Sequence, residues 1–339
     1  MADDTIDTIR EGLTETRENL SHWIDATPSS KKMVQCCSAD PACARDHLRV
    51  IDQSLDKIAA GTFGICEICH DQVNASLLKM DYTSTVCLDH FTGEERKQLE
   101  SELELSQVVQ RGLLPQQAPA IPGLSIAALS RPAQILSGDY FDFVRFRDGA
   151  HGIVLADVSG HGVSAGMLMS SLQTAFHTLV PLSDSPLDVL ERINYLYAHN
   201  VGFTTFVTVF FGRFVEATGR FSYASAGHNS GYVYRAASGT EMLLPPTGPA
   251  IGLMEGFSVR LEHVELHRED TLVLYTDGVT EATDGRNRPW SLDGLAEVVR
   301  RNPRLPPEAL IQKIQSALAG FTGGRPLADD VTLVVGHVN

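Results

Sequence analysis

The sequence predicts an α+β protein in which a helical hairpin with a small metal-stapled module precedes a larger domain of sheets covered by helices. Three observations lead to this prediction. All six cysteines lie before residue 88, and apolar residues recur at helical spacing in the same region. The rest of the chain contains many short strand candidates joined by short turns. With 339 residues, the chain is long enough for about two domains.

The composition argues against several classes of protein. Lys and Arg number 27 and Asp and Glu number 42, so the net charge is −15. An acidic surface repels nucleic-acid phosphates and anionic lipid, so we expect no direct nucleic-acid partner and no membrane partner. No apolar stretch approaches the ~20 residues of a membrane span. The acidic N-terminus is unlike a signal peptide, so we expect a cytoplasmic protein.

Two amphipathic helices are predicted at the start of the chain. Residues 5–25 and residues 44–60 both carry apolar side chains at three-, four- and seven-residue steps. Asp40 and Pro41 fall in the loop between them. The simplest arrangement is an antiparallel hairpin closed by the two apolar faces.

Residues 62–91 are rich in Cys and poor in large apolar side chains, so burial alone cannot stabilise them. They contain a C-x2-C pair and a C-x2-H pair, which are the paired turns that converge on tetrahedral zinc. Four protein ligands leave no open position, so the predicted Zn²⁺ is structural. His70 is an alternative fourth ligand. The predicted ligands are Cys66, Cys69, Cys87 and His90.

This region resembles a known family. The run LDKIAAGTFGICEICHDQV…VCLDH is similar to the zinc finger of the DksA/TraR proteins, with His90 in place of the last cysteine. The preceding hairpin resembles their coiled coil, so the resemblance covers residues 5–92. In that family an acidic motif at the coiled-coil tip reaches into RNA polymerase. Here the tip has Asp40, and Cys43 stands at the second acidic position.

A helix is predicted over residues 92–113, and Pro115, Pro119 and Pro122 end it. Its apolar positions form a broad stripe, which would allow a homodimer to form through this helix. The expected division of the chain is a hairpin with a zinc finger over 1–91, a helical linker over 92–115, and a second domain over 116–339.

The second domain alternates strands with short turns, which argues for mostly antiparallel sheets with helices packed outside. The expected helices span 163–180, 186–199, 292–301 and 307–319. The expected strands span 124–130, 139–146, 152–158, 204–215, 220–225, 231–235, 259–266, 271–276 and 330–337.

Carboxylates stand at the ends of four of these apolar strands. A carboxylate there is unfavourable unless something neutralises it. Mg²⁺ and Mn²⁺ prefer oxygen ligands, and two such ions about 4 Å apart can activate a water molecule. The chain has no phosphate-binding Gly-rich loop and no G-x-S-x-G motif, so metal-dependent hydrolysis is the predicted chemistry. The carboxylates are Asp139, Asp157, Asp277, Asp329 and Asp330.

The same residues carry a second resemblance. The motifs SGDYFDF, ADVSGHGVSAGMLMS, ASAGHN, TGPAIGL, YTDGVTEA and DDVTLVV are similar, in this order, to the SpoIIE/RsbU branch of the PPM (PP2C-type) phosphatases. The resemblance covers residues 112–338 and implies a β-sandwich flanked by helices, with a Mn²⁺ or Mg²⁺ pair between the sheets. It implies catalytic metal ligation by Asp139, Asp157, the carbonyl of Val158, Asp277 and Asp329, with Asp330 as the adjacent alternative.

The function implied is a metal-dependent protein serine/threonine phosphatase under the control of the zinc module. Its substrate would be a phosphorylated anti-sigma-factor antagonist in bacterial partner switching. The alternative is an RNA-polymerase-binding DksA-like regulator with a secondary phosphatase domain. His161 and His228 are candidates for proton transfer or phosphate contact, or are structural histidines in Gly-rich turns.

Overall fold

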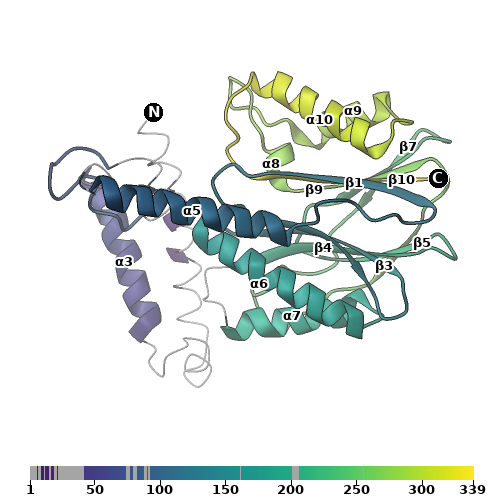
Figure 1. The fold of residues 1–339 in the computed structure, drawn as a ribbon, viewed down its shortest axis with the longest axis horizontal. Helices are drawn as coiled ribbons and strands as arrows, with labels where there is room; N and C mark the ends of the chain where they lie inside the picture. Colours follow the sequence, from purple (N-terminus) through teal and green to yellow (C-terminus); the bar gives the residue numbers. More distant parts are fainter. Residues whose placement is uncertain are drawn as a thin grey trace. The chain divides into compact units, whose positions relative to one another are not determined.

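A computed structural model gives the fold of the chain (Figure 1). It divides into two compact units, one of Met1–Ser106 with Leu196–Thr205 and one of Gln107–Tyr195 with Phe206–Asn339. In the part that the structure describes, no helix is long and apolar enough to cross a membrane. The described residues are 6, 9–10, 12–14, 17–18, 21, 42–73, 77–78, 82–87, 90, 92–160, 162–200, 206–254 and 256–339.

The first unit contains the predicted pairing of helices. The described residues from 6 to 21 are helical, and α3 follows over Ala42–Ala59. Leu13 and Ile51 are buried together in one apolar cluster, and Arg17 Nε donates to Asp52 Oδ1 at 2.5 Å. The predicted tip around Asp40 lies outside the described residues, so the polymerase-binding alternative remains a prediction.

Helix α5 spans Gly93–Leu113, as predicted for the linker. The division between the two compact units falls inside this helix, after Ser106. Its last two turns therefore belong to the second unit.

The second unit is built on two five-stranded sheets, and every pairing within them is antiparallel. The first sheet has the order β1-β10-β9-β6-β7, and the second has the order β2-β3-β4-β5-β8. The strands are β1 Leu124–Arg131, β2 Asp139–Arg145, β3 His151–Val158, β4 Val207–Val215, β5 Arg220–Ala226, β6 Gly231–Arg235, β7 Thr240–Leu244, β8 Glu262–Glu265, β9 Asp270–Tyr275 and β10 Val331–Val338.

Helices cover both outer faces, so the unit has four layers (Figure 1). Helices α9 (Ser291–Arg301) and α10 (Pro307–Thr322) share an apolar core with the first sheet, around Tyr232, Val273 and Leu333. Helices α6 (Val163–Leu179) and α7 (Pro186–Asn200) lie over the second sheet, with the short helix η2 (Val180–Leu182) between them.

A second core fills the space between the sheets. It joins Phe141, Leu155 and Phe210 of the second sheet to Leu274 and Val334 of the first. Side chains on the inner faces are thereby removed from water, which supplies much of the free energy of folding. The predicted α+β sandwich of antiparallel sheets flanked by helices is confirmed.

Strand β7 and helix α8 were not expected from the sequence. Strand β7 lies at the edge of the first sheet, and only Leu244 at its end is buried, so it shows no alternation of apolar and polar residues. Helix α8 (Asp277–Thr280) is a single turn, too short for a helical period to appear. Strand β8, at the edge of the second sheet, covers four residues, fewer than the predicted 259–266.

Candidate functional site

Asp139 and Asp157 lie directly opposite each other across β2 and β3. Asp139 is the first residue of β2, and Asp157 is the last but one of β3. Paired residues of antiparallel strands point to the same face, with Cβ atoms ~4.5–5.5 Å apart. Asp139 is buried, and this burial followed by the charge of Asp157 raises its pKa well above the ordinary value. Two carboxylates therefore share one end of the second sheet.

Thr276 links this end to the first sheet. Its Oγ1 donates to Asp139 Oδ2 at 2.8 Å and accepts a hydrogen bond from the backbone N–H of Thr332 at 3.0 Å. Thr276 follows β9, and Asp277 follows it as the first residue of α8. The end of the second sheet that carries Asp139 and Asp157 therefore lies beside the end of the first sheet that leads into Asp277.

Gly278 allows the chain after β9 to approach the chain before β10. A Cβ atom at this position would lie 2.1 Å from the carbonyl oxygen of Asp330. Any other residue would force the two segments apart. The Asp277-Gly278 pair thus brings Asp277 beside Asp329 and Asp330.

The pKa values show that these carboxylates act on one another. Burial first, and then the charges of Asp277 and Asp329, raise the pKa of Asp157 to about 7. Burial and the charge of Asp277 raise the pKa of Asp329 to about 6, against a hydrogen bond from the backbone of Asp330. Several partly buried negative charges in one place repel one another, and a bound cation would relieve this repulsion.

The structure separates the two neighbouring acids at the start of β10. Asp330 accepts hydrogen bonds from the backbone N–H of Ala133 at 2.7 Å, from Ser137 Oγ at 2.8 Å and from the backbone N–H of Gly138 at 2.8 Å. Its two oxygens thus hold the segment that leads into Asp139. Asp329 accepts one hydrogen bond, from the backbone N–H of Asp330.

Glu281 joins the cluster, although the sequence analysis did not single it out. Its charge contributes to raising the pKa values of Asp157 and Asp329, and its own pKa is raised by burial and by Asp277. Glu281 comes four residues after Asp277, and its backbone N–H donates to the Asp277 carbonyl. That helical spacing in the sequence could have indicated that the two carboxylates lie close together.

The remaining predicted residues flank the cluster. Val158 is fully buried next to Asp157, and its carbonyl oxygen would lie 2.9 Å from a Cβ atom at Gly138. His228 is buried and hydrogen bonded through Nδ1 to Thr208 Oγ1 at 2.7 Å. Burial lowers the His228 pKa to about 4, so the ring is neutral at neutral pH. His161 lies outside the described residues.

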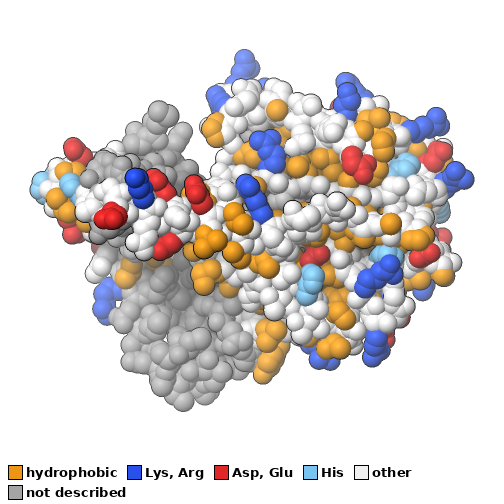
Figure 2. Space-filling view, viewed as in Figure 1, with side chains coloured by type: hydrophobic (Ala, Val, Ile, Leu, Met, Phe, Trp, Pro, Cys, Tyr) orange, Lys and Arg blue, Asp and Glu red, His pale blue; other side chains and the backbone are white. Residues whose placement is uncertain are grey.

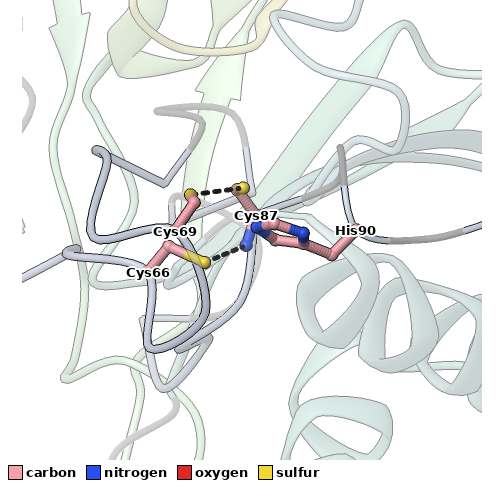
Figure 3. Close-up of side chains that lie close together, drawn as sticks. All are labelled: Cys66, Cys69, Cys87 and His90. Atoms are coloured by element: carbon pink, nitrogen blue, oxygen red, sulfur yellow. Dashed lines mark hydrogen bonds between the residues drawn. The ribbon is translucent and has the colours of Figure 1, made fainter.

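The first unit contains a separate cluster (Figure 3). One ligand atom each from Cys66, Cys69, Cys87 and His90 all lie within 4.8 Å of one another. His90, rather than the alternative His70, is therefore the histidine that joins the cysteines. Cys69 Sγ and Cys87 Sγ are 3.6 Å apart, and a dashed line joins them in Figure 3. The group has the donor set of a closed tetrahedral zinc site.

The backbone around Cys66 supports its thiolate form. The N–H groups of Ile68 and Cys87 both donate to Cys66 Sγ at 3.4 Å. Burial acts to raise the pKa of the Cys66 thiol, but backbone hydrogen bonds from Cys69, Cys87 and Ile68 outweigh it and lower the pKa to about 6. A thiolate is the form that binds a metal.

Gln110 connects α5 to the acidic cluster. Its Nε2 donates to the carbonyl of Ser137 at 2.8 Å, and its Oε1 accepts from the Ser137 backbone N–H at 2.9 Å. Ser137 in turn donates to Asp330 and accepts from the backbone N–H of Asp139 at 3.1 Å. Gln110 also lies against α6, since a Cβ atom at Gly166 would be 3.0 Å from its Nε2.

Comparisons with known proteins give a family and several relatives of this chain. The family model described as "Stage II sporulation protein E (SpoIIE)" matches residues 147–339. The chain is 30% identical over 240 residues to the phosphoserine phosphatase RsbU of Bacillus subtilis, covering 71% of each protein. It is 26% identical over 239 residues to the phosphoserine phosphatase RsbP of the same organism, covering 69% of this chain and 57% of RsbP.

Solved structures show the same fold. The PP2C domain of SiaA from Pseudomonas aeruginosa superposes with a TM-score of 0.65 at 20% identity, covering 73% of this chain and 99% of that domain. The RsbU and RsbW domains of a Mycobacterium tuberculosis protein give a TM-score of 0.54 at 27% identity, covering 65% of this chain and 61% of that one.

Proposed function

Because the chain belongs to the SpoIIE family of PPM-type serine/threonine phosphatases, we propose that it dephosphorylates an anti-sigma-factor antagonist with two Mn²⁺ or Mg²⁺ ions. The observation that carries the proposal is the acidic cluster: Asp139 and Asp157 lie opposite each other on the second sheet, and Thr276, which precedes Asp277, is hydrogen bonded to Asp139. The likeness to RsbU and RsbP, both phosphoserine phosphatases, supports the choice of substrate.

The donor set fits hard divalent cations. Carboxylate and carbonyl oxygens are the ligands that Mg²⁺ and Mn²⁺ prefer, and the repelling charges of the cluster favour a cation. Two such ions would activate a water molecule for attack on phosphorus and neutralise charge on the phosphoryl oxygens. The proposed ligands are Asp139, Asp157, the Val158 carbonyl, Asp277 and Asp329, and we add Glu281 because its charge acts on the same group.

Asp330 has a different role in this proposal. Three donors already occupy its oxygens, and they come from the segment that ends at Asp139. It is therefore a positioning residue, which holds Asp139 in place for the metal pair.

The zinc module is proposed to bind one structural Zn²⁺. The three thiols and the imidazole lie close enough to share one ion, and the backbone lowers the pKa of the Cys66 thiol to about 6. Its apolar cluster is small and includes two of the ligands, Cys66 and Cys87. The metal would add the stability that this core lacks.

Control by the N-terminal module is proposed to act through α5. One face of the helix carries Gln110, which holds Ser137 beside the cluster. Away from Gln110, the helix exposes a stripe of Leu105, Val108 and Val109, with exposed fractions of 63, 63 and 56%. Figure 2 shows hydrophobic side chains gathered on the face of the molecule where α5 and α6 lie. A second copy covering this stripe would fix the angle of α5, and with it Gln110.

A phosphate-release assay tests the activity. The wild-type protein with Mn²⁺ should hydrolyse p-nitrophenyl phosphate and a serine-phosphorylated antagonist. The Asp157→Asn variant should lose activity on the order of 10³-fold, since a residue that holds catalytic charge is removed. Asp293→Asn on the exposed face of α9 is the matched control. Unchanged turnover of Asp157→Asn would contradict the proposed site.

A further inference from the structure

One segment outside the acidic cluster extends the second sheet at its active-site end. The backbones of Val207 and Ile251 exchange two hydrogen bonds, at 2.9 and 2.8 Å. Val207 is also the β4 partner of Val158, which follows Asp157. Two strand spacings therefore separate Ile251 from the strand of Asp157, a distance of about 10 Å.

The backbone after Ile251 is held by a buried side chain of α7. Asn194 has an exposed fraction of 2%, and its Oδ1 accepts from the Gly252 backbone N–H at 2.9 Å. Its Nδ2 donates to the carbonyl of Met254 at 3.1 Å. Gly252 has a φ of +88°, a left-handed conformation that glycine adopts without strain. The segment is therefore anchored on both sides of Leu253.

This anchored segment presents apolar side chains to solvent. Leu253 and Met254 have exposed fractions of 56 and 49%, although Ala250 and Ile251 just before them are buried. A scattered exposed apolar residue needs no explanation. Here, however, two consecutive ones lie on a backbone held by hydrogen bonds on both sides, and they follow Ile251 at the end of the sheet where Asp157 lies.

We propose that Leu253 and Met254 form a docking contact for the phosphoprotein substrate, and that Asn194 is the positioning residue of this contact. The inference rests on the proposed function and specifies which substrates the site prefers. A protein interface covers about 800 Å² on each partner, a patch roughly 30 Å across. Ile251 lies about 10 Å from the strand of Asp157, and Leu253 follows it by two residues, so an interface of this size centred on the acidic cluster extends over this segment.

The occupant is an apolar side chain of the substrate close to its phosphoserine. An extended peptide rises ~3.3 Å per residue, so the contact falls about three residues from the phosphoserine. Small phosphoesters such as p-nitrophenyl phosphate cannot span this distance. The docking contact should therefore raise kcat/KM for phosphorylated peptides and proteins, and it should leave the hydrolysis of small phosphoesters unchanged.

Synthetic phosphoserine peptides test this. One carries Leu three residues before the phosphoserine, one carries Leu three residues after it, and one carries Ser at both positions. For the wild-type protein with Mn²⁺, kcat/KM for one Leu peptide should exceed that for the Ser peptide by about tenfold, since the Leu side chain is buried. The Leu253→Ser plus Met254→Ser variant should lose this preference and keep its turnover of p-nitrophenyl phosphate.

Two further variants complete the design. Leu243→Ser changes an equally exposed leucine on β7, with an exposed fraction of 47%, and should keep the preference. Asn194→Asp cannot donate to the Met254 carbonyl and should reduce the preference without affecting p-nitrophenyl phosphate.

The docking contact would be overturned if the wild type showed no preference for a Leu peptide over the Ser peptide, or if the double variant kept that preference unchanged. A double variant that changes only the oligomeric state would also overturn it, because the patch would then belong to an interface with a second copy. Failure of the wild type to hydrolyse p-nitrophenyl phosphate would contradict the proposed function itself.

Discussion

The side chain of Gln110 and the backbone of Ser137 exchange two hydrogen bonds, and both residues are buried. A helix that begins in the first compact unit is thereby fastened to the segment that leads into Asp139. Since Ser137 also donates to Asp330, one glutamine sets the position of two of the acidic residues.

We predict that Gln110→Leu raises the Mn²⁺ concentration needed for half-maximal activity by about tenfold. The leucine leaves the buried N–H and C=O of Ser137 unsatisfied, at a cost of about 1–3 kcal/mol each. The segment then shifts, and Asp139 shifts with it. Metal titrations with p-nitrophenyl phosphate measure the change, and Gln98→Leu, exposed on the same helix, is the control. A variant that is less stable but has an unaltered metal requirement would reduce Gln110 to a structural role.

The two neighbouring acids before β10 should respond differently to the same substitution. Asp329→Asn should raise the metal requirement and leave the free energy of unfolding of the metal-free protein unchanged or higher. Asp330→Asn should lower that free energy by about 1.5–3 kcal/mol, since it disrupts hydrogen bonds to a charged acceptor. Denaturant unfolding without metal, together with metal titration, separates the two effects. Equal effects in both assays would show that the two acids share one role.

The metal-free protein should become more stable as the pH falls from about 7 towards 4. The pKa of Asp157 is raised to about 7 and that of Asp329 to about 6, and these two shifts outweigh the lowered pKa of His228, so the folded state binds more protons than the unfolded state in this range. Stability is then lost as the pH rises through the folded-state pKa values. Denaturant unfolding at several pH values measures this slope, which saturating Mn²⁺ should reverse or remove. A slope as steep in Asp157→Asn would exclude Asp157 as its source.

Cys66→Ser should lose the zinc and unfold the module around it. Three remaining ligands hold a closed tetrahedral site poorly, and the apolar cluster of the module is too small to compensate. Elemental analysis should find one zinc per chain in the wild type and much less in the variant. His70→Asn is the control, because asparagine tolerates the left-handed backbone of His70 at a φ of 60°. Zinc loss from His70→Asn instead would reassign the fourth ligand.

The exposed stripe on α5 should control association. Leu105→Asp plus Val109→Asp places two charges on the exposed stripe, and a dimer formed through this stripe should dissociate to monomers. Sedimentation velocity measures the change. Lys313→Glu, at an exposed position of α10, changes the charge by the same two units away from the stripe and should leave association unaltered. A wild-type protein that is monomeric throughout the concentration range would disprove the dimer.

The sequence alone determined most of the elements of the second unit, because their signals are local. Strands such as β3 and β9 are almost continuous apolar runs bounded by Gly, Asp or Ser, and a core strand needs nothing more to be recognised. The ordered motifs of the second unit also identify the family without reference to the fold. Strand β7 escaped prediction because an edge strand with one buried residue has no periodicity to read.

Only the tertiary structure decided which residues act together. Asp329 and Asp330 are indistinguishable as neighbours in the chain, but the donors that occupy Asp330 come from almost 200 residues away. The same holds for Gln110, whose partner Ser137 lies 27 residues further along the chain. Hydrophobic patterning records which side of an element is buried. It does not record which distant backbone groups a polar side chain will meet, because those contacts exist only once the two sheets have packed together.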